Sequence, residues 1–329
     1  MSKDAKKEVL KKMKKYYGNN RLKLPAAISI EEAGANSYVM KLNAKKIEED
    51  NMQDNGNAFE GWSLALYAMD ENLKITLDVD GNFKSEAFEG EKRGHFNRFL
   101  YRALRFSEQY DWLALSDELN DRAKKFNENY ILPKICTNNF GQGDAGSNSN
   151  TENIVEGKMA EGKLLSEILS RQNIEIDADR IHRQLAVGLF KGNVSDDTLI
   201  FTGGKSAIDL WTCNEKTFYP IELKADNKMV GIVTEIFFYS NYMFDLVCEG
   251  GAFKLNKDGK DRGYDEIINN YPFEKVKGIM LADEYHPLIN DKILKILNNN
   301  NTNKKISYAM AEYDLNISVE LSIATKKQN

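Results

Sequence analysis

Two acidic residues and a lysine interrupt apolar segments in the second half of this 329-residue chain. Asp209 lies within Ser-Ala-Ile-Asp-Leu-Trp, and Glu222 and Lys224 end Phe-Tyr-Pro-Ile-Glu-Leu-Lys. Residues two apart in a strand point to the same face, so Glu222 and Lys224 project together. If the two segments pair as neighbouring strands through the short polar turn at 214–216, Asp209 comes alongside Glu222.

Two carboxylates beside an ammonium group form a hard oxygen site that suits Mg²⁺, with Mn²⁺ as a substitute. A bound metal would polarise a phosphate oxygen and acidify a water, while Lys224 would orient that water and offset charge. The alternative is a structural ion pair, because Asp, Glu and Lys are common residues and the pattern is short. A carboxylate without a partner in an apolar strand is costly, which favours a functional role for Asp209 and Glu222.

The elements around these residues predict a mixed α/β fold. We expect helices at 158–171, 179–190, 231–247 and 287–298. We expect strands at 198–202, 206–213, 217–224, 276–282 and 306–312. Three consecutive strands favour an antiparallel meander, and the crossover through an apolar helix then requires a parallel strand in the same sheet.

This element order, with Asp209 on one strand and Glu222-Leu223-Lys224 on the next, resembles the PD-(D/E)XK nuclease superfamily over about 158–312. The resemblance implies a restriction-endonuclease-like fold, in which an α-β-β-β-α-β core forms a mixed sheet flanked by helices. It implies that Asp209, Glu222 and the Leu223 carbonyl bind the metal. It also implies that Lys224 positions the attacking water.

The family often carries a metal-site glutamate on its first helix, and the resemblance implies Glu161 in that role. On a helix at 158–171, Glu161 falls between Leu164, Leu165 and Ile168 on the apolar face. A carboxylate that points into the core needs a partner, and a metal would supply one. The alternative is that Glu161 lies in a frayed first turn, where the helix dipole favours an acid.

Other positions extend the family pattern or depart from it. Ile208 stands where the motif has proline. Glu235 and Tyr239 have the spacing of the family's Gln-x-x-x-Tyr, with Glu in place of Gln, and are candidate substrate contacts. The candidate phosphate contacts, chosen by nearness in sequence, are Lys205, Lys228, Arg180 and Arg183.

The composition excludes several classes of protein. The chain is 42% hydrophobic and 29% charged, the balance of an ordinary globular protein. It has no run of 18 apolar residues for a membrane span, and its start lacks an apolar signal core, so we expect a cytoplasmic protein. Three cysteines and three histidines are too few and too scattered for a disulfide framework, a zinc cluster or a haem site.

Charge and low-complexity sequence suggest how the chain is divided. The net charge is −5, yet residues 1–24 hold nine Lys/Arg against two acids. This basic head is either a solvated, frayed helix or an arm that contacts nucleic acid. The Gly-, Ser- and Asn-rich segment 137–152 predicts a linker between an N-terminal α+β domain at 1–136, with target recognition as its candidate role, and a nuclease-like domain at 153–329.

In the N-terminal part we expect helices at 4–17, 95–110 and 117–129 and strands at 37–42, 62–69 and 74–79. Asp80-Gly81 predicts a hairpin turn after the last of these strands. Arg98, Arg102 and Arg105 share one helical face, which is either a solvated stripe or a nucleic-acid contact.

The sequence therefore predicts a magnesium-dependent phosphodiesterase that acts on DNA, an endonuclease of restriction, phage defence or repair. The rival prediction is a non-catalytic nucleic-acid-binding or protein-interaction module on the same fold. Metal-dependent cutting of nucleic acid discriminates between the two.

Overall fold

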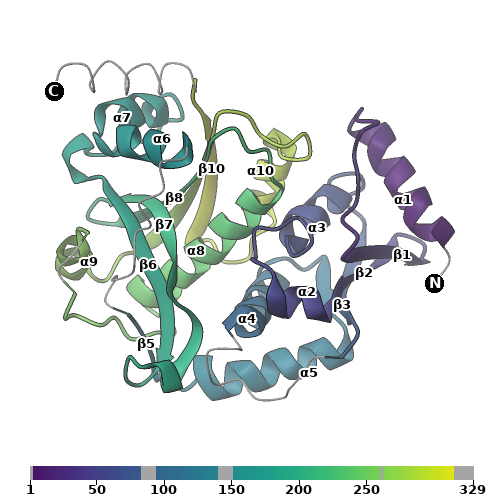
Figure 1. Ribbon diagram of the computed structural model, residues 1–329, viewed down its shortest axis with the longest axis horizontal. Helices are drawn as coiled ribbons and strands as arrows, with labels where there is room; N and C mark the ends of the chain where they lie inside the picture. Colours follow the sequence, from purple (N-terminus) through teal and green to yellow (C-terminus); the bar gives the residue numbers. More distant parts are fainter. Residues whose placement is uncertain (1–2, 83–93, 140–150, 260–261, 315–329) are drawn as a thin grey trace. The chain divides into compact units, whose positions relative to one another are not determined.

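The computed structural model describes residues 3–82, 94–139, 151–259 and 262–314 (Figure 1). Over these residues the protein is an α/β structure with two mixed sheets, each packed against helices. Within the described residues, no helix has both the length and the apolar character needed to cross a membrane.

The chain forms two compact units, and both are discontinuous in sequence. Unit 1 contains Met1–Pro133, Met229–Glu235 and His286–Lys304. Unit 2 contains Lys134–Lys228, Ile236–Tyr285 and Lys305–Asn329. Two segments that we expected within a nuclease-like domain at 153–329 therefore belong to unit 1.

Unit 2 is built on a six-stranded mixed sheet in the order β10-β9-β8-β7-β6-β5. Its strands are β5 (Cys136–Asn138), β6 (His182–Lys191), β7 (Leu199–Cys213), β8 (Thr217–Lys224), β9 (Lys275–Ala282) and β10 (Ile306–Glu312). Antiparallel pairs join β5 to β6, β6 to β7 and β7 to β8, whereas β9 is parallel to β8 and β10 is parallel to β9. The expected parallel strand after the crossover helix is confirmed as β9 beside β8, whereas the antiparallel meander consists of β6, β7 and β8 rather than of the three strands expected from the sequence.

Helices cover this sheet because its strands carry apolar side chains on both faces. The helices and short turns are α6 (Thr151–Ala160), α7 (Lys163–Ser170), η3 (Ala178–Arg180), η4 (Asp196–Thr198), α8 (Gly231–Val247) and α9 (Tyr264–Asn270). Ile221, Leu223 and Ile279 on one face pack in a core with α6 and α7. On β9, a Cβ at Gly278 would lie 2.2 Å from the Ser240 hydroxyl of α8, so this glycine permits close packing of helix on sheet.

Two secondary-structure predictions in unit 2 are wrong. The expected helix at 179–190 is strand β6, whose residues 185–190 are all buried. A short, continuous apolar run has no periodicity that separates a buried strand from a helix. The expected strands at 198–202 and 206–213 are one strand, β7, in which Thr202 and Gly203 have positive φ and the register to β6 shifts. The expected glycine turn is therefore a bulge.

Unit 1 contains a four-stranded sheet in the order β1-β2-β3-β4. Its strands are β1 (Ile28–Gly34), β2 (Ser37–Asn43), β3 (Lys74–Asp80) and β4 (Leu113–Leu115). The β1–β2 pair is antiparallel, and the β2–β3 and β3–β4 pairs are parallel. The helices are α1 (Lys3–Tyr16), α2 (Ala44–Glu49), α3 (Phe59–Tyr67), α4 (Gly94–Gln109), α5 (Asp117–Phe126), the π-helical turn η2 (Asn127–Ile131) and α10 (Asp291–Asn299).

Three predictions in unit 1 need correction. The expected strand at 62–69 is mostly helix α3, whose residues are all buried, so no polar face shows the helical period. Strand β3 does not form the expected hairpin at Asp80-Gly81 with any described strand, because both of its edges pair with parallel strands, and residues 83–93 lie outside the described residues. The arginine stripe of α4 is not a solvated face either, since Arg102 is fully buried and forms a bidentate pair with Glu60.

Candidate active site

The pairing of β7 with β8 brings the predicted acids and lysine to one place. Leu210 pairs with Ile221 in the antiparallel register, and an Asn214 side chain that accepts two backbone N–H groups closes the connecting turn. One residue beyond the Leu210 pair, the Asp209 Oδ2 accepts the Leu223 N–H at 2.9 Å. The Asp209 carboxylate therefore lies against the peptide bond that joins Glu222 to Leu223.

Lys224 links this strand end to a helix. Its Nζ lies 2.6 Å from Glu222 Oε1 and 3.3 Å from Glu152 Oε1 on α6. The side chains of Glu222 and Lys224 are almost completely buried, whereas that of Glu152 is partly exposed. Burial of charges is tolerated only where opposite charges and hydrogen bonds compensate for lost water, which this arrangement provides.

The formal charge of this group suits a divalent cation. Three carboxylates, of Asp209, Glu222 and Glu152, and the Lys224 ammonium sum to −2. Carboxylate oxygens are the ligands that Mg²⁺ prefers. Among the described residues, no three His, Cys, Asp or Glu side chains are arranged as a metal cage. Mg²⁺ nevertheless uses one or two carboxylates and completes its shell with waters and substrate phosphates, so Asp209 and Glu222 fit it.

The expected burial of Glu161 is wrong. The helix predicted at 158–171 is two helices, which break at Gly162, where φ is +90° and a Cβ would lie 1.9 Å from the Ala178 carbonyl oxygen. Glu161 lies in that break, with 63% of its side chain exposed, and it pairs with Lys158 Nζ at 2.8 Å. It lies at the carboxyl end of α6, so the alternative of a first-turn acid is also wrong.

The glutamates that α6 turns toward the sheet are Glu152 and Glu156, which our sequence analysis did not identify. Glu156 is buried and accepts hydrogen bonds from Arg183 Nε at 3.0 Å and Gln184 Nε2 at 2.9 Å. The two acids are four residues apart, and Val155 and Met159 share the buried face. The helical period, extended backwards from Met159 through Val155, would have placed both acids on the sheet-facing side of a helix. The polar sequence before Asn153 instead suggested a linker.

Three of the four predicted phosphate contacts lie in ion pairs. Arg180 pairs with Glu266, Arg183 with Glu156 and Lys228 with Glu284. Lys205 lies in β7, but its side chain is outside the described residues. Their role as phosphate contacts remains a prediction.

Helix α8 contributes the last pair of predicted residues. Glu235 and Tyr239 are both buried. They lie four residues apart on α8, and their role as substrate contacts remains a prediction.

Cysteine chemistry does not suit the interior of this protein. Cys136, Cys213 and Cys248 are buried, and burial raises the pKa of each thiol to about 12. The nucleophilic form of cysteine is the thiolate, which such thiols do not populate at neutral pH. These residues therefore act as small apolar side chains.

Comparison of the chain with known proteins returns no relatives. No family model matches the sequence, and neither curated proteins nor solved structures give a match.

Proposed function

We propose that unit 2 is a metal-dependent nuclease of the PD-(D/E)XK superfamily that hydrolyses phosphodiester bonds in DNA. The observation that carries the proposal is the contact of the Asp209 carboxylate with the Glu222–Leu223 peptide, beside the Glu222–Lys224 pair. The order α6, β6, β7, β8, α8, β9, with β9 parallel to β8, supports it, because it is the α-β-β-β-α-β order of that superfamily.

In this proposal, Asp209, Glu222 and the Leu223 carbonyl hold Mg²⁺. The bound ion supplies polarisation of a phosphate oxygen and a lowered pKa for water. Asp209 is oriented for this role by the Leu223 N–H, which fixes one carboxylate oxygen. Glu222 is oriented in the same way by Lys224.

Lys224 orients the attacking water in this proposal. Its ammonium, fixed by Glu222 and Glu152, donates a hydrogen bond to the water oxygen. The water oxygen would form a bond to phosphorus and release a proton to solvent, while the bond from phosphorus to the leaving oxygen breaks and that oxygen takes up a proton from solvent. Positioning of this kind contributes to rate because the attacking and leaving oxygens must lie in line.

The test is incubation of the full chain with plasmid DNA, single-stranded DNA and RNA in Mg²⁺, Mn²⁺ or EDTA. We expect metal-dependent cutting of DNA that EDTA abolishes. Binding without cutting would favour the rival module, and cutting that persists in EDTA would contradict the proposed chemistry.

A further inference from the structure

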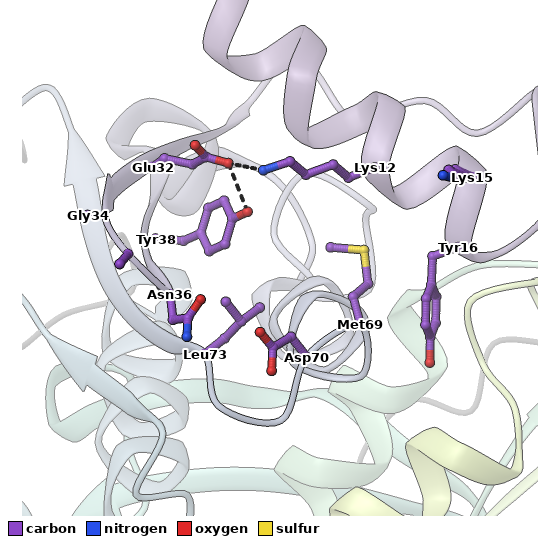
Figure 2. A pocket seen from close by; sticks show the side chains of 11 residues that line it. Lys12, Lys15, Tyr16, Glu32, Gly34, Asn36, Tyr38, Met69, Asp70 and Leu73 are labelled. Carbon is purple, nitrogen blue, oxygen red and sulfur yellow. Dashed lines mark hydrogen bonds and ion pairs between the residues drawn. The ribbon is translucent and has the colours of Figure 1, made fainter.

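Unit 1 contains a pocket of about 640 Å³ that no part of the proposed cleavage site uses (Figure 2). Helix α1, the β1–β2 turn and the α3–β3 loop form its walls. The polar and aromatic residues that line it include Lys12, Lys15, Tyr16, Glu32, Asn36 and Asp70. This volume falls within the range of about 300–1,000 Å³ that small-molecule sites occupy.

The wall formed by α1 is fixed to the rest of unit 1. Val9 and Met13 are completely buried, and Lys6 Nζ donates hydrogen bonds to the carbonyls of Pro25 and Ile28. The basic head is thus an anchored helix rather than a frayed one. Its outward lysines are held at the pocket rim instead of moving freely with a disordered segment.

Tyr16 has a partly exposed ring that is held in place, with Lys292 Nζ 5.6 Å from the ring centroid. The residue is 45% exposed, yet its hydroxyl donates to the Ala68 carbonyl at 2.7 Å and accepts from Lys292 Nζ at 3.0 Å. An exposed ring that is already ordered provides a stacking surface without further loss of side-chain entropy.

The opposite walls present polar groups on an ordered backbone. Asn36 lies in the tight β1–β2 turn with φ of 57°, and its carbonyl accepts the Lys74 N–H at 2.8 Å, which joins two walls of the pocket. The backbone N–H and side-chain amide of Asn72 donate to Asp70 Oδ1 at 2.9 and 3.0 Å. Figure 2 shows the Asn36 amide and the Asp70 carboxylate on the same side of the pocket.

Charge is distributed unevenly around the pocket. Lys12 forms an ion pair with Glu32, which also accepts a hydrogen bond from the Tyr38 hydroxyl at 3.1 Å. The Lys12 ammonium holds the pKa of Glu32 below its usual range, so this acid stays ionised at neutral pH. Lys15 is exposed and makes no hydrogen bond or ion pair with another described residue. The rim therefore carries an available cation, whereas Asp70 and Glu32 carry negative charge on the walls.

We propose that this pocket binds a nucleotide, with its base against Tyr16 and its phosphate at Lys15. A ligand that is anionic throughout would be repelled by Asp70 and Glu32. The base of a nucleotide is neutral, and its N–H groups can donate hydrogen bonds to Asp70. Aromatic stacking and a lysine at the phosphate are the usual means of holding an unpaired nucleotide. The bound nucleotide is either free or an unpaired nucleotide within a DNA strand. The second case rests on the proposed nuclease function.

The test measures binding to the full chain in EDTA, so that cutting does not intervene. One arm uses a fluorescein-labelled 12-nucleotide single-stranded DNA, and the other uses the four deoxynucleoside monophosphates by calorimetry. We expect Tyr16→Ala and Lys15→Ala each to weaken binding by about tenfold. Binding of monophosphates identifies a free nucleotide, and binding of the oligonucleotide alone identifies a strand, so either result supports the pocket.

Lys11→Ala is the matched control, because Lys11 is exposed on the same helix but does not line the pocket. Ala35→Trp fills the pocket without a change of charge and should abolish binding. The proposal is overturned if wild-type protein binds neither probe, if Lys11→Ala and Lys15→Ala weaken binding equally, or if Ala35→Trp binds normally. If the wild-type protein does not cleave DNA but still binds a probe in a Tyr16-dependent way, the nuclease proposal is contradicted and the pocket proposal stands.

Discussion

The Lys224 ammonium lies 2.6 Å from the Glu222 carboxylate, two residues away on the same strand, and both side chains are almost completely buried. A third charged group, Glu152 on α6, lies 3.3 Å from the same ammonium. Lys224 thus neutralises one of the two acids on which the proposed metal site depends. If the proposed metal site is correct, stability and metal binding are coupled through this residue.

Lys224→Met should destabilise the metal-free protein by about 3–5 kcal/mol, because it leaves the Glu222 charge buried without its ammonium. Mn²⁺ should bind at least as tightly and recover part of this stability, while cleavage is lost. Urea unfolding in EDTA and in Mn²⁺ measures the effect. Lys216→Met is the control, since the Lys216–Glu274 pair is exposed and contributes at most about 1 kcal/mol. Complete loss of Mn²⁺ binding in Lys224→Met would contradict the role given to this lysine.

The sequence was most informative where an element has one recognisable pattern. Strand β8 and the turn before it were predicted because apolar residues run up to Glu222 and polar residues at 214–216 interrupt them. Strand β6 was missed because its buried stretch has no alternation, and α3 was missed because every residue in it is buried. Burial on all sides removes the polar positions from which a period is read.

The candidate site was predicted only in part for a related reason. Asp209, Glu222 and Lys224 lie on strands whose pairing follows from a short turn, so sequence sufficed to bring them together. Glu161 was placed wrongly because α6 ends just before Gly162. A projection of side chains around one helix axis does not hold across such a break. Close approach of the Ala178 carbonyl to Gly162 is a tertiary contact, which no local pattern predicts.

Glu152→Gln should lower cleavage by about tenfold, because Glu152 helps to fix the Lys224 ammonium that orients the attacking water in the proposed site, and loss of such a supporting contact typically costs about 10- to 100-fold. The change keeps the shape of the side chain and removes the charge that holds Lys224. Glu161→Gln, just beyond the end of the same helix, should leave cleavage within about twofold, because Glu161 is largely exposed and pairs with Lys158 rather than with Lys224. Initial rates on plasmid DNA measure both, and equal effects of the two changes would exclude Glu152 from the site.

Arg102→Met should destabilise unit 1 by about 3–5 kcal/mol, since it leaves the fully buried Glu60 without its bidentate partner. Thr234 donates to the same carboxylate at 2.8 Å, which ties segment Met229–Glu235 to unit 1. Thr234→Val should cost about 1–2 kcal/mol. Urea unfolding provides the measurement.

The control for these two changes is Lys45→Met, which removes an exposed pair with Glu49. It should cost at most about 0.5 kcal/mol. Combining Arg102→Met with Glu60→Leu should recover stability relative to Arg102→Met alone, because no buried charge is then left unpaired. An Arg102→Met protein as stable as the Lys45→Met protein would show that the buried pair contributes little.

Stability should fall as the pH decreases from about 7.5 to 5.5. Burial lowers the pKa of His286, whose Nδ1 accepts the Leu288 N–H at 3.2 Å and must be unprotonated to do so. A histidine with a lowered folded pKa contributes stability above its unfolded pKa of about 6.5, and this is lost as pH falls below that value. Urea unfolding over this range should show a smaller pH dependence for His286→Asn. An unchanged dependence would contradict the assignment.

The central claim is that Asp209 and Glu222 form a metal site for phosphodiester hydrolysis, and Asp209→Asn tests it most directly. Asparagine can still accept the Leu223 N–H, so the fold should persist while the metal loses a charged ligand. Asp226→Asn, an exposed change close by in sequence, is the matched control. In Mg²⁺ with plasmid DNA, the account predicts that Asp209→Asn lowers the cleavage rate at least about 100-fold. The same variant should bind Mn²⁺ more weakly and keep the wild-type melting temperature. The Asp226→Asn protein should cleave at the wild-type rate. Wild-type turnover by a folded Asp209→Asn protein would contradict the account.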